Sequence, residues 1–441
     1  MSDRTSAFTR RRFLKTAAAT TAALAAPQFI PATALGKDGA VAASERITVG
    51  GIGINSRGRA VLAGFLSQPD VQFLATCDIR ADRRKKIKDL ADRKYGNKDC
   101  ATYRDLRELL ARKDLDAVLI TTGDRWHALG SVMAAKAGKD VYCEKPCSMT
   151  IGESQILADV MRRYGRVFQV GTQRRSVGNF QFAAELARSG KLGKLQTLQA
   201  SIAYYRPQII HEWLPAEPEP PKEKEDWDLW LGPAPWRPYN HAYAAGIGGW
   251  LCAFDFNAGG GFLNWASHTV DLCQWANQTD GTTPVEFEPI GPERGYAAKR
   301  VVHARYANGV KLVMCAHNGP GWLGLGSCSV RYEGEEGWVE TGDSGKIALY
   351  PETLRTERTV FTTTGNATTL HVRNFLDCVK SRAQPACNAD IARSSHVAGH
   401  AAAIAWMLDR KVAFDPAKEA FIGDDEANRM RSRAVREPWR F

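Results

Sequence analysis

One segment near the middle of the chain carries three side chains that together could accept a proton. Residues 262–276 follow three glycines and predict a helix. Asn264, His268 and Asp271 stand on it at positions i, i+4 and i+7, so they share one face. A histidine between an amide and a carboxylate can be held in one tautomer and take a proton near neutral pH. The alternative is a structural histidine with its hydrogen bonds satisfied.

A second candidate is a lysine that directly follows an apolar run. Glu144, Lys145 and Pro146 come after the strand predicted at 140–143. The carboxyl end of a parallel strand is where open sheets bind ligands, so Lys145 could meet both a cofactor and a substrate hydroxyl. A surface lysine paired with Glu144 is the alternative.

The spacing of a dinucleotide-binding turn occurs after the first predicted strand. Gly53-Ile54-Asn55-Ser56-Arg57-Gly58 matches G-x-G-x-x-G with Asn55 in the second position, where asparagine can tolerate a positive φ. Asp78 ends the second strand and is placed to hold the ribose hydroxyls. Its carboxylate favours NAD over NADP, although Arg80 nearby leaves NADP open. A plain turn and a surface aspartate are the alternatives.

The segment Thr121-Thr122-Gly123-Asp124-Arg125-Trp126-His127 follows the third predicted strand and is expected to line the nicotinamide side. His127 could equally be a residue at the start of a helix that takes no part in the chemistry. The residues predicted to bind the cofactor are Gly53, Asn55, Ser56, Arg57, Gly58, Asp78, Thr121, Thr122, Trp126, His127, Glu144 and Lys145. We predict no metal site.

Two kinds of structure must position these groups. Between 46 and 171, apolar strands at 46–52, 71–77, 117–121, 140–143 and 167–170 alternate with helices at 59–66, 128–137 and 151–163, which predicts a doubly wound parallel sheet. Later, strands at 195–205, 298–307, 309–317, 328–332, 337–340 and 346–349 precede helices at 370–380 and 392–408. Asn308-Gly309 predicts a hairpin. This half should be a mostly antiparallel open sheet with helices on one face.

Composition restricts the function classes. The chain has 441 residues, a length that suggests two or three domains. Its hydrophobic content of 44% is typical of a globular protein, and its net charge is +11. Basic residues are scattered and form no stripe with aromatic residues, so we expect no nucleic-acid partner. The ten cysteines contain no C-x-x-C pair and mostly occupy apolar strands and helix faces, as buried thiols do.

The first residues are typical of an export signal. Arg10, Arg11 and Arg12 precede Phe13-Leu14-Lys15 and a run of small residues, and 32–34 is a small-x-small cleavage candidate. The paired arginines resemble the twin-arginine signal. We therefore expect a signal and linker over 1–44, a Rossmann domain over 45–171 and a substrate and oligomerisation domain over 172–441. The mature protein should be periplasmic or otherwise exported, with no membrane anchor.

Eight motifs in order carry a family resemblance. They are GINSRG (53–58), Asp78, TTGDRWHA (121–128), EKP (144–146), VGTQRRS (170–176), WDLWLGPAPWRPYN (227–240), GGGFLNWASHTVD (259–271) and HVRNFLDCVKSR (371–382). Over 45–441 the chain resembles the Gfo/Idh/MocA oxidoreductases, and more closely their exported bacterial branch. The resemblance implies a Rossmann domain, an α/β domain that often makes dimer or tetramer contacts, and hydride transfer between NAD(P) and a sugar, sugar acid or cyclitol hydroxyl.

The resemblance also implies residue roles. Lys145 would polarise the reacting hydroxyl, His268 would take its proton, and Asp271 matches an acidic residue one turn later. The chain departs from the family at Asn264, where studied sugar and inositol dehydrogenases carry aspartate. Either Asn264 only orients His268 or binds substrate, or Asp271 supplies the charge.

Several residues could shape a sugar site. Trp227, Trp230, Trp236 and Tyr239 have flat faces suited to stacking on pyranose rings, with core packing as the alternative for each. The polar residues that could enter the pocket are Tyr205, Arg206, His211 and Asp255.

Three functions compete at this point. The first is an NAD-dependent sugar or glycoside dehydrogenase with a retained cofactor. The second is an NAD-dependent glycosidase that oxidises C3 transiently and eliminates the aglycone, with Tyr205 or His211 as the extra base. The third is a catalytically dead carbohydrate-binding relative.

Overall fold

A computed structural model describes residues 41–202, 213–251, 253–291, 301–316, 321–356, 361 and 367–441. Ile47–Phe441 form one compact unit, separate from Met1–Arg46. The export signal expected over 1–44 lies outside the described residues except for its last four positions.

The first half of the compact unit is a parallel sheet. Its strands are β1 (Ile47–Ile52), β2 (Val71–Cys77), β3 (Ala101–Tyr103), β4 (Ala117–Ile120), β5 (Asp140–Cys143) and β6 (Phe168–Val170). The order is β3-β2-β1-β4-β5-β6, and all pairs are parallel, which confirms the Rossmann prediction. The edge strand β3 was not predicted because three partly exposed residues carry no apolar run.

Helices cover both faces of this sheet. They are α2 (Ser56–Leu66), α3 (Ala81–Tyr95), α4 (Leu106–Leu110), α5 (Asp124–Lys136) and α6 (Ile151–Tyr164). Along β4, Val118 and Ile120 pack with α4, α5 and α6, whereas Ala117 and Leu119 point into the opposite cluster. The predictions placed the starts of α2 and α5 at residues 59 and 128, which is three and four residues later than observed. The first turns of both helices lack apolar periodicity, so the sequence pattern did not reveal them.

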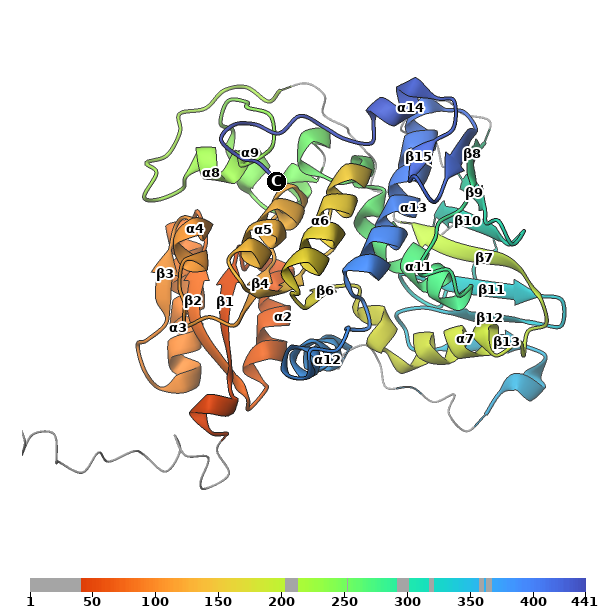
Figure 1. Ribbon diagram of the computed structural model, residues 1–441, viewed down its shortest axis with the longest axis horizontal. Coiled ribbons are helices and arrows are strands. Elements are labelled where there is room, and N and C mark those ends of the chain that lie inside the picture. Colours follow the sequence, from red (N-terminus) through yellow and green to blue (C-terminus); the bar gives the residue numbers. More distant parts are fainter. Residues whose placement is uncertain are drawn as a thin grey trace, which may run out of the picture. The chain divides into compact units, whose positions relative to one another are not determined.

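A helix from near the chain end completes one face of the Rossmann sheet. Helix α12 (Ala367–Ser381) packs against α2, as Figure 1 shows. Its Val372 and Phe375 are fully buried, and the Phe375 ring lies 6.1 Å from that of Phe65. The packing therefore crosses the boundary that the sequence placed at residue 171.

The second sheet has nine strands. They are β7 (Leu195–Ile202), β8 (Glu286–Ile290), β9 (Val301–Arg305), β10 (Lys311–Ala316), β11 (Val330–Gly334), β12 (Trp338–Thr341), β13 (Ile347–Tyr350), β14 (Val412–Asp415) and β15 (Ala420–Phe421). The order is β13-β12-β11-β7-β10-β9-β8-β14-β15, antiparallel except for β7 beside β10. The predicted hairpin joins β9 and β10, with Gly309 at φ 88°.

The remaining helices pack on this sheet or lie near the cleft. They are α7 (Gly178–Arg188), α8 (Trp227–Leu231), α9 (His241–Ala244), α10 (Ile247–Trp250), α11 (Leu263–Ala276), α13 (Ala389–Leu408) and α14 (Asp425–Arg429), with short 3-10 turns at Ala43–Glu45, Gln173–Ser176, Phe254–Phe256, Gly259–Gly261 and Glu352–Leu354. Helices α7, α11 and α13 cover one sheet face, and α13 also packs on α6. Helices α11 and α13 thus stand between the two sheets (Figure 1).

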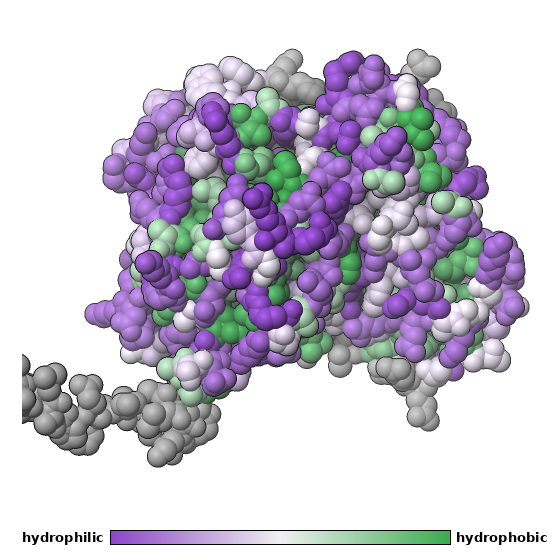
Figure 2. All heavy atoms as spheres, in the orientation of Figure 1, coloured by the Kyte–Doolittle hydropathy of each residue, from purple (hydrophilic) through white to green (hydrophobic). Residues whose placement is uncertain are grey.

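The surface and the cysteines agree with an ordinary globular unit. On the face shown in Figure 2, hydrophilic residues cover most of the described surface and hydrophobic residues occur in separate groups. None of the described helices is both long and apolar enough to cross a membrane. The nine described cysteines are unpaired thiols, eight of them buried, which confirms their expected role as small hydrophobic residues.

Candidate active site

A single cleft collects the residues predicted to bind a dinucleotide. All twelve of them line it, together with Asn264 from α11. They converge because β1, β2, β4 and β5 are parallel, so the loops that follow these strands leave the same edge of the sheet. Helix α11 enters this edge from the other half of the chain.

The turn after β1 is shaped for close backbone approach. Gly53 has φ 70°, and a Cβ on it would lie 2.9 Å from the Thr122 Cα. A Cβ on Gly58 would lie 2.9 Å from the Thr121 Cβ. The first turn of α2 lines the cleft, and the N–H groups at a helix N-terminus are suited to binding a pyrophosphate. One expectation is corrected: Asn55 is extended, at φ −144°, and Ser56 has the positive φ, of 27°.

Asp78 follows β2 directly and lines the same cleft. Its side chain accepts a hydrogen bond from the Arg80 N–H at 2.9 Å and is 7% exposed. Burial raises the pKa of Asp78 to about 6, although Arg83 opposes this. Arg80 itself pairs with Asp82, and Arg83 lines the cleft instead. Arg83 is thus a cation beside the expected ribose site, three residues beyond the one that the sequence suggested.

His127 ties two loops of the cleft together. Its Nδ1 lies 2.6 Å from the Pro146 carbonyl oxygen, and its Nε2 lies 3.2 Å from the Thr122 carbonyl oxygen. Burial lowers the pKa of His127. Both ring nitrogens therefore face backbone oxygens, which favours the structural alternative for this residue.

Lys145 reaches from the Rossmann half to α11. Its Nζ donates to the Asn264 backbone oxygen at 2.7 Å and to Asn264 Oδ1 at 2.6 Å. Glu144 accepts instead from Arg57 Nε at 3.3 Å and from the Lys145 N–H at 3.2 Å. Burial lowers the pKa of Lys145, while Glu144 and Asp124 act against this shift. The Lys145 ammonium is therefore partly buried in the cleft and bonded to an amide, so it is not the surface lysine paired with Glu144 that the alternative describes.

His268 lies one turn beyond Asn264 on α11. It is 4% exposed, and its Nδ1 has no hydrogen-bond partner among the described residues. Burial lowers the pKa of His268 well below its usual value, and the charges of Arg174 and Lys145 lower it further. The ring is therefore neutral at pH 7, and the same effects make it a weaker base than an ordinary histidine.

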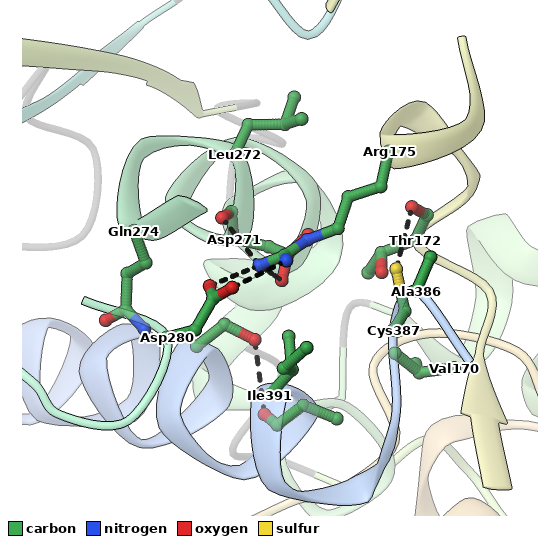
Figure 3. Close-up of polar contacts among 12 residues, drawn as sticks. Val170, Thr172, Arg175, Asp271, Leu272, Gln274, Asp280, Ala386, Cys387 and Ile391 are labelled. Carbon is green, nitrogen blue, oxygen red and sulfur yellow. Dashed lines mark hydrogen bonds and ion pairs between the residues drawn. The ribbon is translucent and has the colours of Figure 1, made fainter. Parts of the chain in front are cut away.

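Asp271 belongs to an ion-pair cluster and not to His268. Arg175 Nε donates to Asp271 Oδ2 at 2.7 Å, and Arg175 Nη2 donates to Asp271 Oδ1 at 2.9 Å and to Asp280 Oδ1 at 2.6 Å (Figure 3). Burial raises the pKa of Asp271 to about 6 despite Arg175. Of the alternatives for His268, the one in which Asp271 supplies the charge is disfavoured, because Arg175 bonds to both carboxylate oxygens of Asp271.

The aromatic segment is mostly core. Trp227 is 2% exposed and stacks on Trp230 at 4.6 Å, with Tyr239 edge-on at 5.2 Å. Trp236 is 57% exposed and does not line the cleft, whereas Trp230 does. Core packing is therefore the correct reading for Trp227 and Tyr239, and Trp230 remains as a candidate contact.

Only one of the four polar residues proposed to enter the pocket is among the described residues. Asp255 pairs with Arg237 and is absent from the cleft lining. Tyr205, Arg206 and His211 lie outside the described residues.

Residues 213–250, here called the cover segment, close over the cleft beside Asp78. The Ala81 N–H donates to the Lys224 oxygen at 3.0 Å, and the Asp226 N–H donates to the Ile79 oxygen at 3.3 Å. Trp126 Nε1 donates to the Leu229 oxygen at 3.1 Å. The lining residues of the cover segment are Leu229, Trp230, Ala244, Gly246 and Trp250. The sequence indicated aromatic residues suited to a sugar site in this segment, but not where the segment lies.

Asp124 and Arg125 line the cleft, although neither of them was assigned an individual role from the sequence. Asp124 is 3% exposed, and Arg125 is 6% exposed. Arg125 Nε donates to the Trp230 oxygen at 2.8 Å, and its guanidinium lies 3.6 Å from the Trp230 ring centroid. Their position just after β4 was the available signal. No cluster of three or more metal-ligating side chains occurs in the described part of the chain.

The glycine cradle, the α2 N-terminus and buried Asp78 fit a nicotinamide dinucleotide, and the fold and cleft define a two-domain NAD-binding oxidoreductase. Residues 47–172 match the family model described as the oxidoreductase family, NAD-binding Rossmann fold. Residues 211–441 match the model of the C-terminal alpha/beta domain of the same family. The chain belongs to the Gfo/Idh/MocA oxidoreductase family.

Individual relatives share parts of the chain. An inositol 2-dehydrogenase of Salmonella paratyphi B is 31% identical over 32% of this chain and 41% of its own length. A glycosyl hydrolase family 109 protein of Saccharopolyspora erythraea is 32% identical over 37% of this chain and 39% of its own length. The chain thus spans about two fifths of these relatives. The crystal structure of myo-inositol 2-dehydrogenase from Lactobacillus plantarum has the same fold, with a TM-score of 0.57 and 18% identity over 84% of this chain and all of that one.

Proposed function

We propose that this protein transfers a hydride between the nicotinamide of NAD and a hydroxyl of a sugar, glycoside or cyclitol. The observation that carries the proposal is the Lys145 ammonium, held by Asn264 in the same cleft as Gly53, Gly58 and Asp78. The inositol dehydrogenase relative supports a polyhydroxylated substrate. Asp78 favours NAD, and Arg83 beside it leaves NADP possible.

Lys145 and His268 would have different roles in the reaction. When bound, the nicotinamide supplies the hydride acceptor or donor. Lys145 Nζ would donate a hydrogen bond to the reacting oxygen and stabilise its developing negative charge. His268, neutral and with Nδ1 unpartnered among the described residues, would take the hydroxyl proton. Asn264 positions Lys145 by accepting two of its hydrogen bonds.

Substituting these two residues tests the assignment. Lys145→Ala and His268→Ala should each lower kcat by roughly 10²-fold or more while NAD stays bound, because general acid–base and electrostatic groups contribute on that scale. The exposed Lys136→Ala in α5 is the matched control. Near-normal turnover by His268→Ala would show that another group is the base.

The cover segment supports a retained cofactor. It hydrogen-bonds to Ile79 and Ala81, just after Asp78, and would overlie the adenosine end of a bound dinucleotide. Together with the twin-arginine pattern at 10–11, this suggests loading in the cytoplasm and export of the folded protein. The enzyme would then run two half-reactions, oxidising one sugar and reducing another. A homo-oligomer remains our expectation from the family.

The decisive experiment uses protein exported by its own signal and purified without added cofactor. Denaturation should release NAD, identified by mass spectrometry. The native protein is then incubated with a glycoside panel while absorbance near ~340 nm and product mass are followed. A two-dalton loss in the sugar supports the dehydrogenase. No nucleotide, and none taken up on addition, would contradict the cofactor assignment, and protein recovered only in the cytoplasm would contradict export.

The second candidate is an NAD-dependent glycosidase, which the relationship to a glycosyl hydrolase family 109 protein favours. Transient oxidation at C3 would acidify the C2 proton, the aglycone would leave, water would add, and the hydride would return. Aglycone release without net redox change in the same experiment identifies it. Its proposed extra base, Tyr205 or His211, lies outside the described residues.

A further inference from the structure

Residues 430–441, here called the return segment, pack beside the cover segment. They follow α14 and run back toward α5 and α8 (Figure 1). The Gly152 N–H donates to the Arg431 oxygen at 2.8 Å, which attaches the start of the return segment to α6. The Arg436 N–H donates to the Pro233 oxygen at 3.1 Å, which attaches its middle to the cover segment. The return segment therefore bridges the Rossmann half and the cover segment.

Trp439 is the buried anchor of the return segment. Its side chain is 5% exposed and belongs to an apolar cluster that also contains Leu106 of α4 and Leu229 of α8. Its ring meets that of Trp126 edge-on with the centroids 4.7 Å apart, and the Arg107 guanidinium lies 5.1 Å from the Trp439 ring centroid. Such aromatic and cation contacts add to the energy of burial. Because Trp126 lines the cleft and Trp439 does not, Trp439 packs against the cleft wall without entering the cleft.

Arg436 is the polar anchor of the return segment. Its Nε donates to the Gly232 oxygen at 3.0 Å, and its Nη1 and Nη2 donate to Asp228 Oδ1 at 2.6 Å and to the Asp228 backbone oxygen at 2.8 Å. Gly232 directly follows α8, where backbone oxygens lack helical partners. Arg436 therefore holds α8 of the cover segment at its C-terminal end.

The two anchors act on one contact in the cleft wall. Trp126 Nε1 donates to the Leu229 oxygen at 3.1 Å, and a Cβ on Gly232 would overlap the Trp126 indole ring. Trp439 packs on that ring, and Arg436 holds Gly232. Both partners of the contact between Trp126 and the cover segment are thus supported by the return segment, and Trp126 and Leu229 line the cleft.

We propose that Trp439 and Arg436 are positioning residues that clamp the cover segment over the cleft and thereby limit the exchange of a bound dinucleotide. The inference rests on the proposed function in taking a dinucleotide as the occupant of the cleft. Neither residue lines the cleft, so each acts through Trp126 or the cover segment and not by touching the ligand. The clamp slows exchange because the cover segment leaves Trp126 only when the Arg436 hydrogen bonds break as well.

The first test measures dinucleotide exchange. NAD-loaded protein is mixed with an excess of etheno-NAD, and the exchange is followed by fluorescence. Trp439→Ala removes the support of the Trp126 ring and should speed exchange roughly tenfold or more. Trp439→Phe keeps an edge-on aromatic ring and should stay within about threefold of the parent. An unchanged exchange rate in Trp439→Ala overturns the inference.

A second buried aromatic residue controls for a general loss of stability. Phe287 on β8 is fully buried, its ring centroid lies 6.0 Å from that of Phe414, and it does not line the cleft. Phe287→Ala should lower the melting temperature, as Trp439→Ala does, but leave dinucleotide exchange unchanged. Equal acceleration by the two variants would overturn the inference, because destabilisation alone would then account for faster exchange.

A double-mutant cycle tests the polar anchor. Arg436→Ala and Asp228→Ala each remove the bond between these two side chains, so each should speed exchange. The double variant should exchange no faster than Arg436→Ala, because the Asp228 carboxylate then has no Arg436 to lose. Arg440→Ala, at an exposed side chain of the same segment that pairs with Glu437, is the control and should exchange like the parent. Accelerations that multiply in the double variant would contradict a clamp made by this pair.

Amide hydrogen exchange separates the inference from the proposed function. In nucleotide-free protein, Trp439→Ala and Arg436→Ala should raise the amide exchange rate several-fold in peptides covering 223–234 and leave it unchanged in β8. Unchanged amide exchange at 223–234 in both variants overturns the inference. If Trp439→Ala does not fold, Arg436→Ala carries both measurements. If amide exchange rises as described but the parent binds no dinucleotide, the clamp stands and the proposed function fails.

Discussion

Gly58 shows how little space the cofactor turn leaves. A Cβ there would overlap the Thr121 side chain, so the turn and the loop after β4 could not keep their present approach. Gly58→Ala should weaken NAD binding roughly tenfold or more, measured by calorimetry on nucleotide-free protein. Gly64→Ala in the same helix is the control, because its Cβ would meet nothing closer than Val372 Cγ2 at 3.4 Å. Equal affinities for both variants would contradict the close-approach role.

Asp78 makes stability depend on pH. Its pKa is raised from 3.8 to about 6 by burial, so the folded protein holds this proton more tightly than the unfolded chain. Asp78 therefore favours folding below pH 4, and that contribution is lost as the pH rises through 6, by roughly 3 kcal/mol at most. Asp78→Asn should gain stability relative to the parent between pH 4 and 7 in urea unfolding of nucleotide-free protein. Parallel curves would contradict the burial effect.

Residue types and spacing predicted the cleft better than the polar pairings within it. Gly53, Asp78 and Lys145 follow strands whose carboxyl ends meet, and topology alone brings them together. Asp271 shares a helix with His268, but its partner Arg175 lies 96 positions away in the sequence. Helical spacing cannot reveal such a distant competitor for a carboxylate.

At the scale of elements, α12 is needed to cover the Rossmann sheet. Phe375 is fully buried against Phe65 and Tyr142. Phe375→Ala should lower the free energy of unfolding by about 3–5 kcal/mol because it opens a cavity between α12 and α2. Leu370→Ala, at a side chain 54% exposed on the same helix, should change it by less than about 0.5 kcal/mol. Similar losses would show that α12 is only loosely attached.

Elements with strong apolar runs were predicted closely, and those without were not. The strands at 71–77 and 140–143 have the expected bounds, and the open sheet with helices on one face is confirmed. Helix α12 was expected, but its docking on the first sheet was not. A helix shows the same pattern of apolar residues whichever sheet it packs on. The pattern therefore predicts that one face of α12 is buried, but not which sheet buries it.

At the scale of the whole molecule, the cover segment joins the two halves of the chain over the cleft. Gly232 lies against Trp126 with φ 54°, and a Cβ there would overlap the indole ring. Gly232→Ala should lift the segment and speed NAD release several-fold, measured by stopped-flow displacement, with little change in the chemical step. Gly248→Ala, where a Cβ meets nothing within 4 Å, is the control. Unchanged release would show that the segment does not retain the nucleotide.

The position of α12 in the sequence also bears on how the protein is made. Synthesis proceeds from the N-terminus, so the ribosome must release residue 381 before one face of the first sheet can be covered. Until then Phe65 and Tyr142 have no Phe375 to pack against. The nascent nucleotide-binding half therefore cannot mature as an independent early product. Its completion waits for residue 381, and we expect dinucleotide binding by the nascent chain to require the same wait.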